Sequence, residues 1–376
     1  MIVDLLRNDL GRLAPPGGVQ VEALCRLDAY PTVWQMSSRI VAEPIHAGLG
    51  DIFRALFPRG DAMQAVSAFP PAIPGYNKKL KTLLGEVIPL AAKRAGGIAW
   101  EYWFHFGGGS PLWVSGMAQG TAIQGLSRAA SRLNHRSYLT TARKALGIFR
   151  TRPPAGVRDV MGRGRAHYLI YSFSREHVLN AFIQSLNGLH DYAVYANDKS
   201  ALRLFKDGTG EARLEVPRYD TGAWSLYQPG EESDLGYHTL LRDFLRSLCE
   251  RLTTDRAKAK KGGHAVSAWP NPARYCTAGR HFTTYLTQKP KVAVRPLSAR
   301  VGHTALVRVG LSKISSVTLT VTRGGAIASQ RSLQLGHGRH TLSWGPVAKK
   351  GKVVVTVRAT DLAGNVGSSS EPLTVR

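Results

Sequence analysis

The residue types best suited to acid–base chemistry gather in one stretch of the chain, from Tyr219 to His238. Tyrosine and histidine occur there four times, and both can donate hydrogen bonds, accept them and move protons. Asp220-Thr-Gly222 interrupts any preceding helix, and Gly236 stands just before a predicted amphipathic helix. Aromatic hydroxyls on a turn between helices commonly line a polar pocket. The alternative is a loop whose tyrosines fill a core and bond their hydroxyls to the backbone.

The elements that must position this stretch are predicted to be helices. Apolar residues recur at helical spacing from Tyr76 to about residue 289, for example at Val178, Phe182 and Leu189. Pro89 is expected to kink the first helix, and two glycines to weaken the fifth. Helices separated by Gly- and aromatic-rich loops favour an α/α barrel or toroid around a central groove. The predicted helices are 78–94, 115–132, 137–149, 176–195, 200–215, 237–252 and 272–286.

Short β-branched runs replace the helical pattern after Pro290. Glycine-containing turns separate these runs, which predicts a small all-β sandwich. The last turn and run, from Asp361 to Val375, resemble the final hairpin of bacterial immunoglobulin-like modules. This resemblance implies either carbohydrate binding or a spacer role. The runs are 292–294, 305–309, 317–321, 340–344 and 352–358.

The charge of the chain favours anionic partners. Its 376 residues allow two or three domains, and 50 Lys and Arg against 25 Asp and Glu give a net charge of +25. Nucleic acid, an acidic polysaccharide and an anionic surface all fit such a charge. The basic residues are scattered, and only Lys258-Ala-Lys-Lys261 forms a run. No nucleic-acid-binding module accompanies them, so nucleic acid is not the expected partner.

Cysteine usage predicts no metal site. Cys25, Cys249 and Cys276 lack metal-ligand spacing, and no cofactor is expected. Cys249 and Cys276 can pair in an oxidising compartment, although we expect free buried thiols. No apolar run approaches the roughly 20 residues of a transmembrane helix. The start, Met1-Ile-Val-Asp4, shows no secretory signal.

The first sixty residues contain motifs that belong together. They are Val3-Asp-Leu-Leu-Arg-Asn-Asp-Leu-Gly-Arg12, Gly18-Val-Gln-Val21, Tyr30-Pro-Thr-Val33 and Asp51-Ile-Phe-Arg-Ala-Leu-Phe-Pro58. This segment resembles the chorismate-utilising enzymes, the synthase subunits that make anthranilate and aminodeoxychorismate. Trp34 replaces the family's catalytic histidine, and the segments with its magnesium-binding glutamates are missing. The resemblance therefore implies a short α+β fragment without chorismate chemistry.

Five blocks follow one another in the helical region. They are Trp113-Val-Ser-Gly-Met-Ala-Gln-Gly120 with Leu126-Ser-Arg-Ala129, Gly156-Val157, Val178-Leu-Asn-Ala-Phe182 with Leu186-Asn-Gly-Leu-His-Asp191, Pro217-Arg-Tyr-Asp-Thr-Gly222, and Gly236-Tyr-His238. Over about residues 76–288 their order and spacing resemble the C-terminal domain of the D-glucuronyl C-5 epimerases. That family inverts carbon 5 of glucuronate in heparan-type polysaccharides. The chorismate-like fragment stands where the family has its N-terminal β portion.

The implied reaction determines which residues matter. Epimerisation removes the proton from the carbon beside a carboxylate and returns a proton on the opposite face. Because an ionised carboxylate makes that carbon a poor acid, the site must stabilise an enolate-like dianion and hold two proton carriers. Tyrosine, with an ordinary pKa of ~10, can serve where cations or hydrogen bonds lower that value.

The resemblance places catalytic tyrosines at Tyr219, Tyr237 and Tyr171. Ile170 stands where the family has an acidic partner for the third tyrosine. Substrate contacts are expected from Asn180, His238, Gln119, Trp113, Trp224 and Tyr227. The alternatives are packing for Tyr171, a satisfied core amide for Asn180, a helix cap for His238, and a groove wall for Gln119 and Trp113.

The sequence thus predicts four segments: a chorismate-binding-like fragment at 1–60, a linker at 61–75, an epimerase-like helical domain at 76–289, and an immunoglobulin-like sandwich at 290–376. The first hypothesis is a cofactor-independent epimerase that acts on an acidic, uronate-containing polysaccharide. The resemblance implies an extracytoplasmic or cell-surface protein, whereas the lack of a visible secretory signal leaves a cytoplasmic location as the alternative. The second hypothesis is a non-catalytic acidic-glycan binder or cell-surface protein. Chorismate chemistry and nucleic-acid binding are not favoured.

Overall fold

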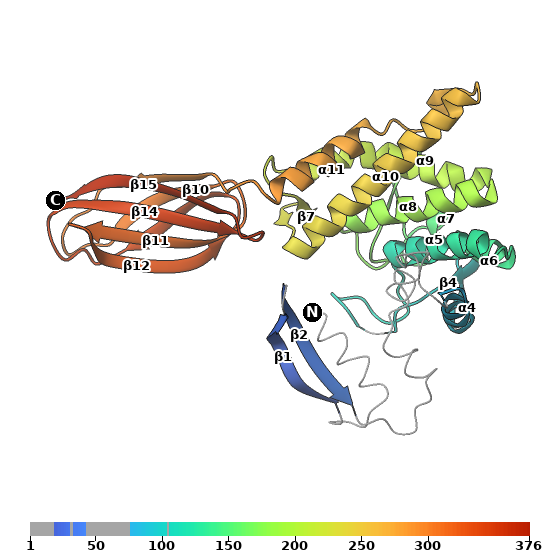
Figure 1. The fold of residues 1–376 in the computed structure, drawn as a ribbon, viewed down its shortest axis with the longest axis horizontal. Helices are drawn as coiled ribbons and strands as arrows, with labels where there is room; N and C mark the ends of the chain where they lie inside the picture. Colours follow the sequence, from blue (N-terminus) through green and yellow to red (C-terminus); the bar gives the residue numbers. More distant parts are fainter. Residues whose placement is uncertain (1–18, 31–32, 43–75, 104) are drawn as a thin grey trace. The chain divides into compact units, whose positions relative to one another are not determined.

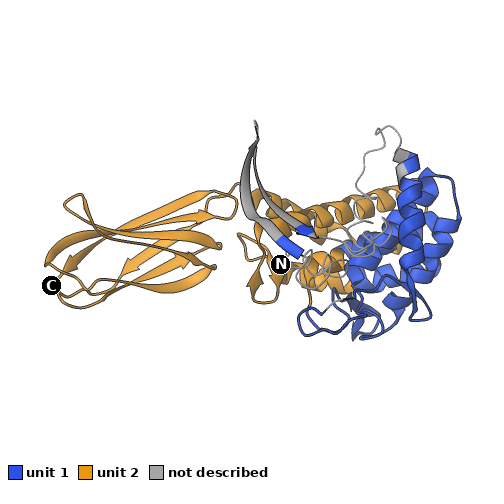
Figure 2. Ribbon diagram, turned by 90° about the horizontal axis from the view of Figure 1, so that it is seen from below, with its two compact units in different colours: residues 1–176, 184–209 blue, residues 177–183, 210–376 orange. Residues whose placement is uncertain are grey.

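The computed structural model describes residues 19–30, 33–42, 76–103 and 105–376 (Figure 1). The predicted linker and most of the chorismate-like fragment lie outside these residues. The chain divides into two compact units, residues 1–176 with 184–209 and residues 177–183 with 210–376 (Figure 2). The division falls inside two helices. The four segments predicted from the sequence stay a prediction.

The described part of the N-terminal segment is a β-hairpin. Strand β1 (Val19–Tyr30) pairs with β2 (Val33–Ala42) in antiparallel register, and Tyr30 lies opposite Val33. The described residues of the predicted α+β fragment are therefore strands, and the prediction of helix in this fragment lies outside the described residues.

The first unit also contains helices and short hairpins. Ser115 caps α5, because its side chain accepts a hydrogen bond from the Ala118 amide. A Cβ atom on Gly120 or on Gly188 would collide with the backbone of the facing helix, so glycine permits this close approach. Two helices, α8 (Leu179–Ala196) and α9 (Lys199–Glu215), lie partly in each unit. The elements that lie wholly in the first unit are α4 (Tyr76–Val87), η1 (Ile88–Leu90), β3 (Ala92–Arg94), β4 (Gly97–Ala99), α5 (Gly116–Arg132), α6 (Ser137–Ala145), α7 (Gly147–Arg150), β5 (Arg158–Gly162) and β6 (Arg165–Tyr168).

The first predicted helix, 78–94, is wrong at its C-terminal end. α4 stops at Val87, ahead of Pro89, which lacks the N–H that a continuing helix requires. Residues 92–94 instead form β3, which pairs with β4. The predicted helix 137–149 is likewise divided, into α6 and α7.

The predicted weakness of the fifth helix is wrong, because α9 runs through both of its glycines. A Cβ atom on Gly208 would clash with the side chains of Leu186 and Tyr168. Close side-chain packing therefore explains this glycine better than a helix break does. Tyr168 completes the contact, since its hydroxyl donates to the Leu204 carbonyl over 2.6 Å.

The second unit contains two long helices joined by a disulfide. They are α10 (Leu235–Lys261) and α11 (Ala273–Tyr285). α10 extends beyond the predicted end at residue 252, because buried positions continue to Ala259. Cys249 and Cys276 are bonded, with their Cα atoms 5.0 Å apart. The expectation of free thiols at these two positions is wrong, because packing of the two helices brings their half-buried cysteines together.

The C-terminal region is all β. One sheet has the order β13-β10-β9 and the other β12-β11-β14-β15, and neighbouring strands within each sheet are antiparallel. Val307 and Leu342 of the first sheet share one apolar core with Val317 and Val355 of the second. The strands are β9 (Val292–Pro296), β10 (Ala305–Leu311), β11 (Ser315–Arg323), β12 (Ala326–Leu335), β13 (Gly338–Trp344), β14 (Gly351–Asp361) and β15 (Val366–Val375).

The sequence predicted five of these strands and the final hairpin, but it missed β12. This edge strand reads Ala-Ile-Ala-Ser-Gln-Arg-Ser-Leu-Gln-Leu and is mostly exposed, so it lacks the apolar alternation that predicts a strand. In the described ranges, none of the helices combines the length and the apolar character needed to cross a bilayer.

Candidate functional site

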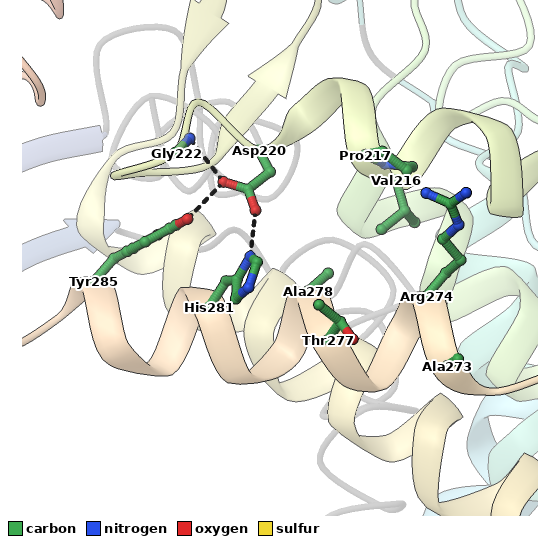
Figure 3. Close-up of a pocket in the computed structure, with 10 residues that line it drawn as sticks. All are labelled: Val216, Pro217, Asp220, Gly222, Ala273, Arg274, Thr277, Ala278, His281 and Tyr285. Atoms are coloured by element: carbon green, nitrogen blue, oxygen red, sulfur yellow. Dashed lines mark hydrogen bonds and ion pairs between the residues drawn. The ribbon is translucent and has the colours of Figure 1, made fainter.

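A pocket of about 560 Å3 in the second unit lies beside the stretch from Tyr219 to His238, whose residue types suit acid–base chemistry (Figure 3). One wall comes from the short helix η2 (Val216–Tyr219) and the residues after it, and the other from α11. Val216 and Pro217 make part of the wall apolar, and Asp220, Arg274 and His281 contribute polar groups. A cavity of this size with a few convergent polar side chains is typical of small-ligand sites.

Asp220 is the centre of the hydrogen bonding in this pocket. Its Oδ1 atom accepts from the Gly222 amide and from the Tyr285 hydroxyl, each over 2.9 Å. Its Oδ2 atom lies 2.8 Å from Nδ1 of His281. Gly222 has a φ of +84°, a conformation that glycine adopts without strain, and this turn directs its amide at the carboxylate. The local turn therefore fixes the carboxylate that orients two side chains of α11.

His281 has the geometry of a general base. Nδ1 of His281 faces the Asp220 carboxylate oxygen and is the ring nitrogen that donates to it, which leaves Nε2 as the nitrogen available to a ligand. The side chain is 51% exposed, so a ligand in the pocket can reach it. This carboxylate–imidazole pairing orients a histidine for proton transfer.

Tyr285 is suited to donating a hydrogen bond. Burial, and next the hydrogen bond to Asp220, raise the pKa of Tyr285 above its ordinary range. The hydroxyl therefore stays protonated at neutral pH. Figure 3 shows Tyr285 and His281 pointing from α11 toward Asp220. Arg274 lies on the same side of the helix and supplies a permanent positive charge at the pocket.

The end of α11 that carries Tyr285 is bonded to the β region. Lys313 is fully buried, and its Nζ atom donates to the Tyr285 carbonyl over 2.6 Å and to the Gln288 carbonyl. The same atom lies 2.8 Å from Oδ2 of Asp361. A cation suits these carbonyls, because the C-terminus of a helix is negatively polarised. Lys313 thus holds the helix end beside the pocket.

Tyr219 is the last residue of η2 and is not among the residues that line the pocket. It is 3% exposed, and its hydroxyl donates to the His177 carbonyl over 2.5 Å. Burial, and next the charge of Glu215, raise the pKa of Tyr219 above its ordinary range. These contacts fit the alternative given for this stretch, in which tyrosines fill a core and bond their hydroxyls to the backbone. A catalytic role for Tyr219 stays a prediction.

Trp224 and His238 form a buried stack with ring centroids 3.7 Å apart. Nε2 of His238 donates to the Phe282 carbonyl over 2.9 Å, and Nδ1 lies 2.8 Å from Oγ of Ser225. Burial lowers the pKa of His238 to about 4. His238 is therefore neutral at pH 7 and links the predicted stretch to α11.

Tyr227 and Tyr237 form a second pair, with ring centroids 4.7 Å apart. Both side chains are half-buried, so part of each ring remains accessible. Asn180, also in the second unit, is 3% exposed, and its Oδ1 accepts from the Ala181 amide over 2.7 Å.

The other predicted site residues belong to the first unit. Trp113 stacks on Tyr102 with centroids 4.0 Å apart, and its centroid lies 5.7 Å from that of Tyr171. Gln119 is fully buried and pairs its amide with the backbone of Trp100. The structure therefore brings together three predicted pairs: Trp113 with Tyr171, Trp224 with His238, and Tyr227 with Tyr237.

The polar residues of α11 that line the pocket are not among the site residues predicted from the sequence. Arg274, Ala278, His281 and Tyr285 succeed one another at spacings of four, three and four residues, which places them on one face of a helix. This pattern was readable from the sequence. Their convergence on Asp220 was not, because 61 residues separate His281 from that carboxylate.

Comparisons with known proteins confirm the resemblances to the D-glucuronyl C-5 epimerases and to the chorismate-utilising enzymes. Residues 95–261 match the family model described as D-glucuronyl C5-epimerase C-terminus, and residues 1–63 match the one described as chorismate binding enzyme. A D-glucuronyl C5-epimerase of Caenorhabditis elegans is 34% identical over 132 residues, which cover 31% of this chain and 21% of that protein.

Aminodeoxychorismate synthase component 1 of Klebsiella aerogenes is 46% identical over 61 residues, covering 16% of this chain and 14% of that protein. The chain thus spans less than a quarter of the length of either relative. Among solved structures, the unsaturated glucuronyl hydrolase of Bacillus sp. GL1 aligns with a TM-score of 0.39 and 12% identity, over 63% of this chain and 61% of that one.

Proposed function

We propose that this chain is an epimerase-like protein that inverts carbon 5 of glucuronate units in an acidic polysaccharide. The observation that carries the proposal is the site around Asp220, which joins the Tyr-Asp-Thr-Gly block to His281 and Tyr285 beside a pocket. The similarity of residues 95–261 to the D-glucuronyl C5-epimerase C-terminus supports the reaction class. We further propose an α/α toroid for the helical region and an immunoglobulin-like fold for the β region.

Arg274 would bind the carboxylate of the sugar acid, and its charge would make the neighbouring carbon more acidic. Nε2 of His281 would take the C5 proton. The electron pair left behind would move into the carboxylate, and the resulting dianion would be stabilised by Arg274 and by hydrogen-bond donors of the pocket. Asp220 orients the imidazole and stabilises its protonated form.

Return of a proton on the opposite face needs a second carrier. Tyr219, Tyr237 and Tyr171 are the candidates that the family resemblance supplies, and they remain a prediction. Tyr237 is half-buried and lies beside Tyr227, which supports it as a residue that can contact a sugar. The burial of Tyr219 favours a role in supporting the segment that holds Asp220.

A second candidate function is a non-catalytic acidic-glycan binder. The observation in its favour is Ile170, which stands where the epimerase family has an acidic residue. Binding without turnover would then rest on the same pocket and on the positive charge of the chain. Chorismate chemistry has no support beyond the similarity of residues 1–63.

The exchange of hydrogen at carbon 5 tests the proposal. The full chain is incubated with heparosan in heavy water, and deuterium at carbon 5 is measured by NMR. The epimerase proposal predicts incorporation that Tyr237→Phe lowers. A folded chain that binds heparosan and incorporates no deuterium would instead establish the non-catalytic binder.

A further inference from the structure

The β region is strongly basic. Residues 290–376 contain thirteen Lys and Arg but only two acidic residues, Asp361 and Glu371. Asp361 is buried against Lys313, so it does not neutralise the surface. Strands β9, β10 and β13 contain no Asp or Glu at all. The three-stranded sheet therefore carries uncompensated positive charge.

Strand register gathers three arginines on the outer face of this sheet. Val307 and Val309 of β10 are buried, so Arg308 between them points outward, away from the core. Arg308 lies directly opposite Arg295 of β9. Arg339 of β13 lies opposite Gly310, two residues along the same face. All three arginines are exposed.

This arrangement is unfavourable without an anion. Like charges at directly opposite positions of neighbouring strands destabilise a sheet, and their Cβ atoms lie only about 5 Å apart. Among the residues that the structure describes, none forms an ion pair or side-chain hydrogen bond with Arg295, Arg308 or Arg339. An anionic group placed over the three guanidinium groups would remove the repulsion and accept several hydrogen bonds.

The rest of the face is suited to a carbohydrate. Thr341 lies opposite Arg308 and Ser343 lies opposite Leu306, so hydroxyl groups flank the arginines. The outward positions of the three strands hold no aromatic ring of the kind that stacks on the bases of single-stranded nucleic acid. Charge and hydrogen-bonding groups therefore favour a polyanion with many hydroxyls.

We infer that the outer face formed by Arg295, Arg308 and Arg339 binds a linear, uronate-containing polysaccharide. The identity of this polymer rests on the proposed function, and the face would hold the chain of which one sugar is processed in the pocket. The β region is then a binding module as well as the support of the helix end at Tyr285.

The test compares two triple variants of the full chain with equal loss of charge. One is Arg295→Gln/Arg308→Gln/Arg339→Gln. The other is the control Arg331→Gln/Lys352→Gln/Arg358→Gln, whose positions are exposed on the four-stranded sheet. Affinity for heparosan is measured by calorimetric titration, and thermal unfolding confirms that both variants fold.

The inference predicts roughly tenfold weaker binding for the first variant and a change of less than about twofold for the control. Equal losses in the two variants would show a non-specific charge effect and overturn the inference, as would unchanged binding in the first. An equal loss of affinity for a DNA duplex would overturn the assignment to a polysaccharide.

The same samples separate this inference from the proposed function. Deuterium exchange into a short glucuronate oligosaccharide reports the pocket, because a short ligand does not need the arginine face. Absence of exchange in the wild-type chain would defeat the proposed reaction whatever the titrations show. Arginine-independent binding would defeat the inference whatever the exchange shows.

Discussion

Replacing His238 with glutamine is expected to remove a specific part of the acid sensitivity of the fold. The wild-type imidazole is fully buried between Trp224 and Phe282, and both of its nitrogens are engaged. Burial lowers the pKa of His238 from 6.5 to about 4. An unfolded chain would bind a proton near the ordinary value instead. Folding therefore competes with protonation of this residue.

The sign of the effect follows from this order of pKa values. Neutral His238 makes its full contribution to the free energy of unfolding above pH 6.5, and this contribution declines as the pH falls toward 4. Over that range the unfolded chain binds about one more proton, so stability decreases by about 1.4 kcal/mol per pH unit. Between the ordinary pKa of 6.5 and the folded-state pKa of about 4, the free energy of unfolding therefore falls by about 3 kcal/mol.

Urea unfolding of the wild-type chain and of His238→Gln between pH 4 and pH 7.5 measures this difference. The wild type should lose about 3 kcal/mol more than the variant as the pH falls, since all other titrating groups are shared. NMR titration of the His238 ring supplies an independent value. Parallel stability curves, or a ring that titrates near its ordinary pKa in the folded chain, would refute this reasoning.

Three further predictions concern stability. Lys313→Ala leaves the buried carboxylate of Asp361 without its cation and should lower the free energy of unfolding by about 3–5 kcal/mol, measured by urea unfolding. The double variant Lys313→Met/Asp361→Asn should recover most of that loss, and no recovery would disprove the coupling of the two residues. Reduction of the Cys249–Cys276 bond, which closes a 27-residue separation, should cost about 3–4 kcal/mol, measured by unfolding with and without reductant. Gly188→Ala should cost about 1–3 kcal/mol because its methyl group meets the Gly120 backbone, whereas the open position Gly85→Ala should be neutral or stabilising; the reverse order would contradict the α5–α8 packing.

Periodicity made most elements predictable. The predicted helices 115–132 and 272–286 agree with α5 and α11 to within one residue at each end, and the β region follows from its β-branched runs. The errors have local causes. Pro89 ended a helix that apolar spacing alone extends, and the polar sequence of β12 hid an edge strand.

The site was predictable only in part. The stretch from Tyr219 to His238 does lie at a pocket, but its predicted tyrosines are not the groups that Asp220 orients. The disulfide and the Asp220–His281 pair both join residues that are distant in the sequence. Such contacts depend on helix packing, which the spacing of apolar residues does not specify.

The most direct test of the central claim is the rate of deuterium incorporation at carbon 5 of heparosan, compared between the wild-type chain and two histidine variants. His281→Gln removes the proposed base, and His264→Gln changes an exposed histidine outside the pocket. We predict incorporation in the wild type and in His264→Gln, and a loss of at least about 100-fold in His281→Gln. Equal incorporation by all three proteins would contradict the assignment of the proton transfer to the site that Asp220 organises.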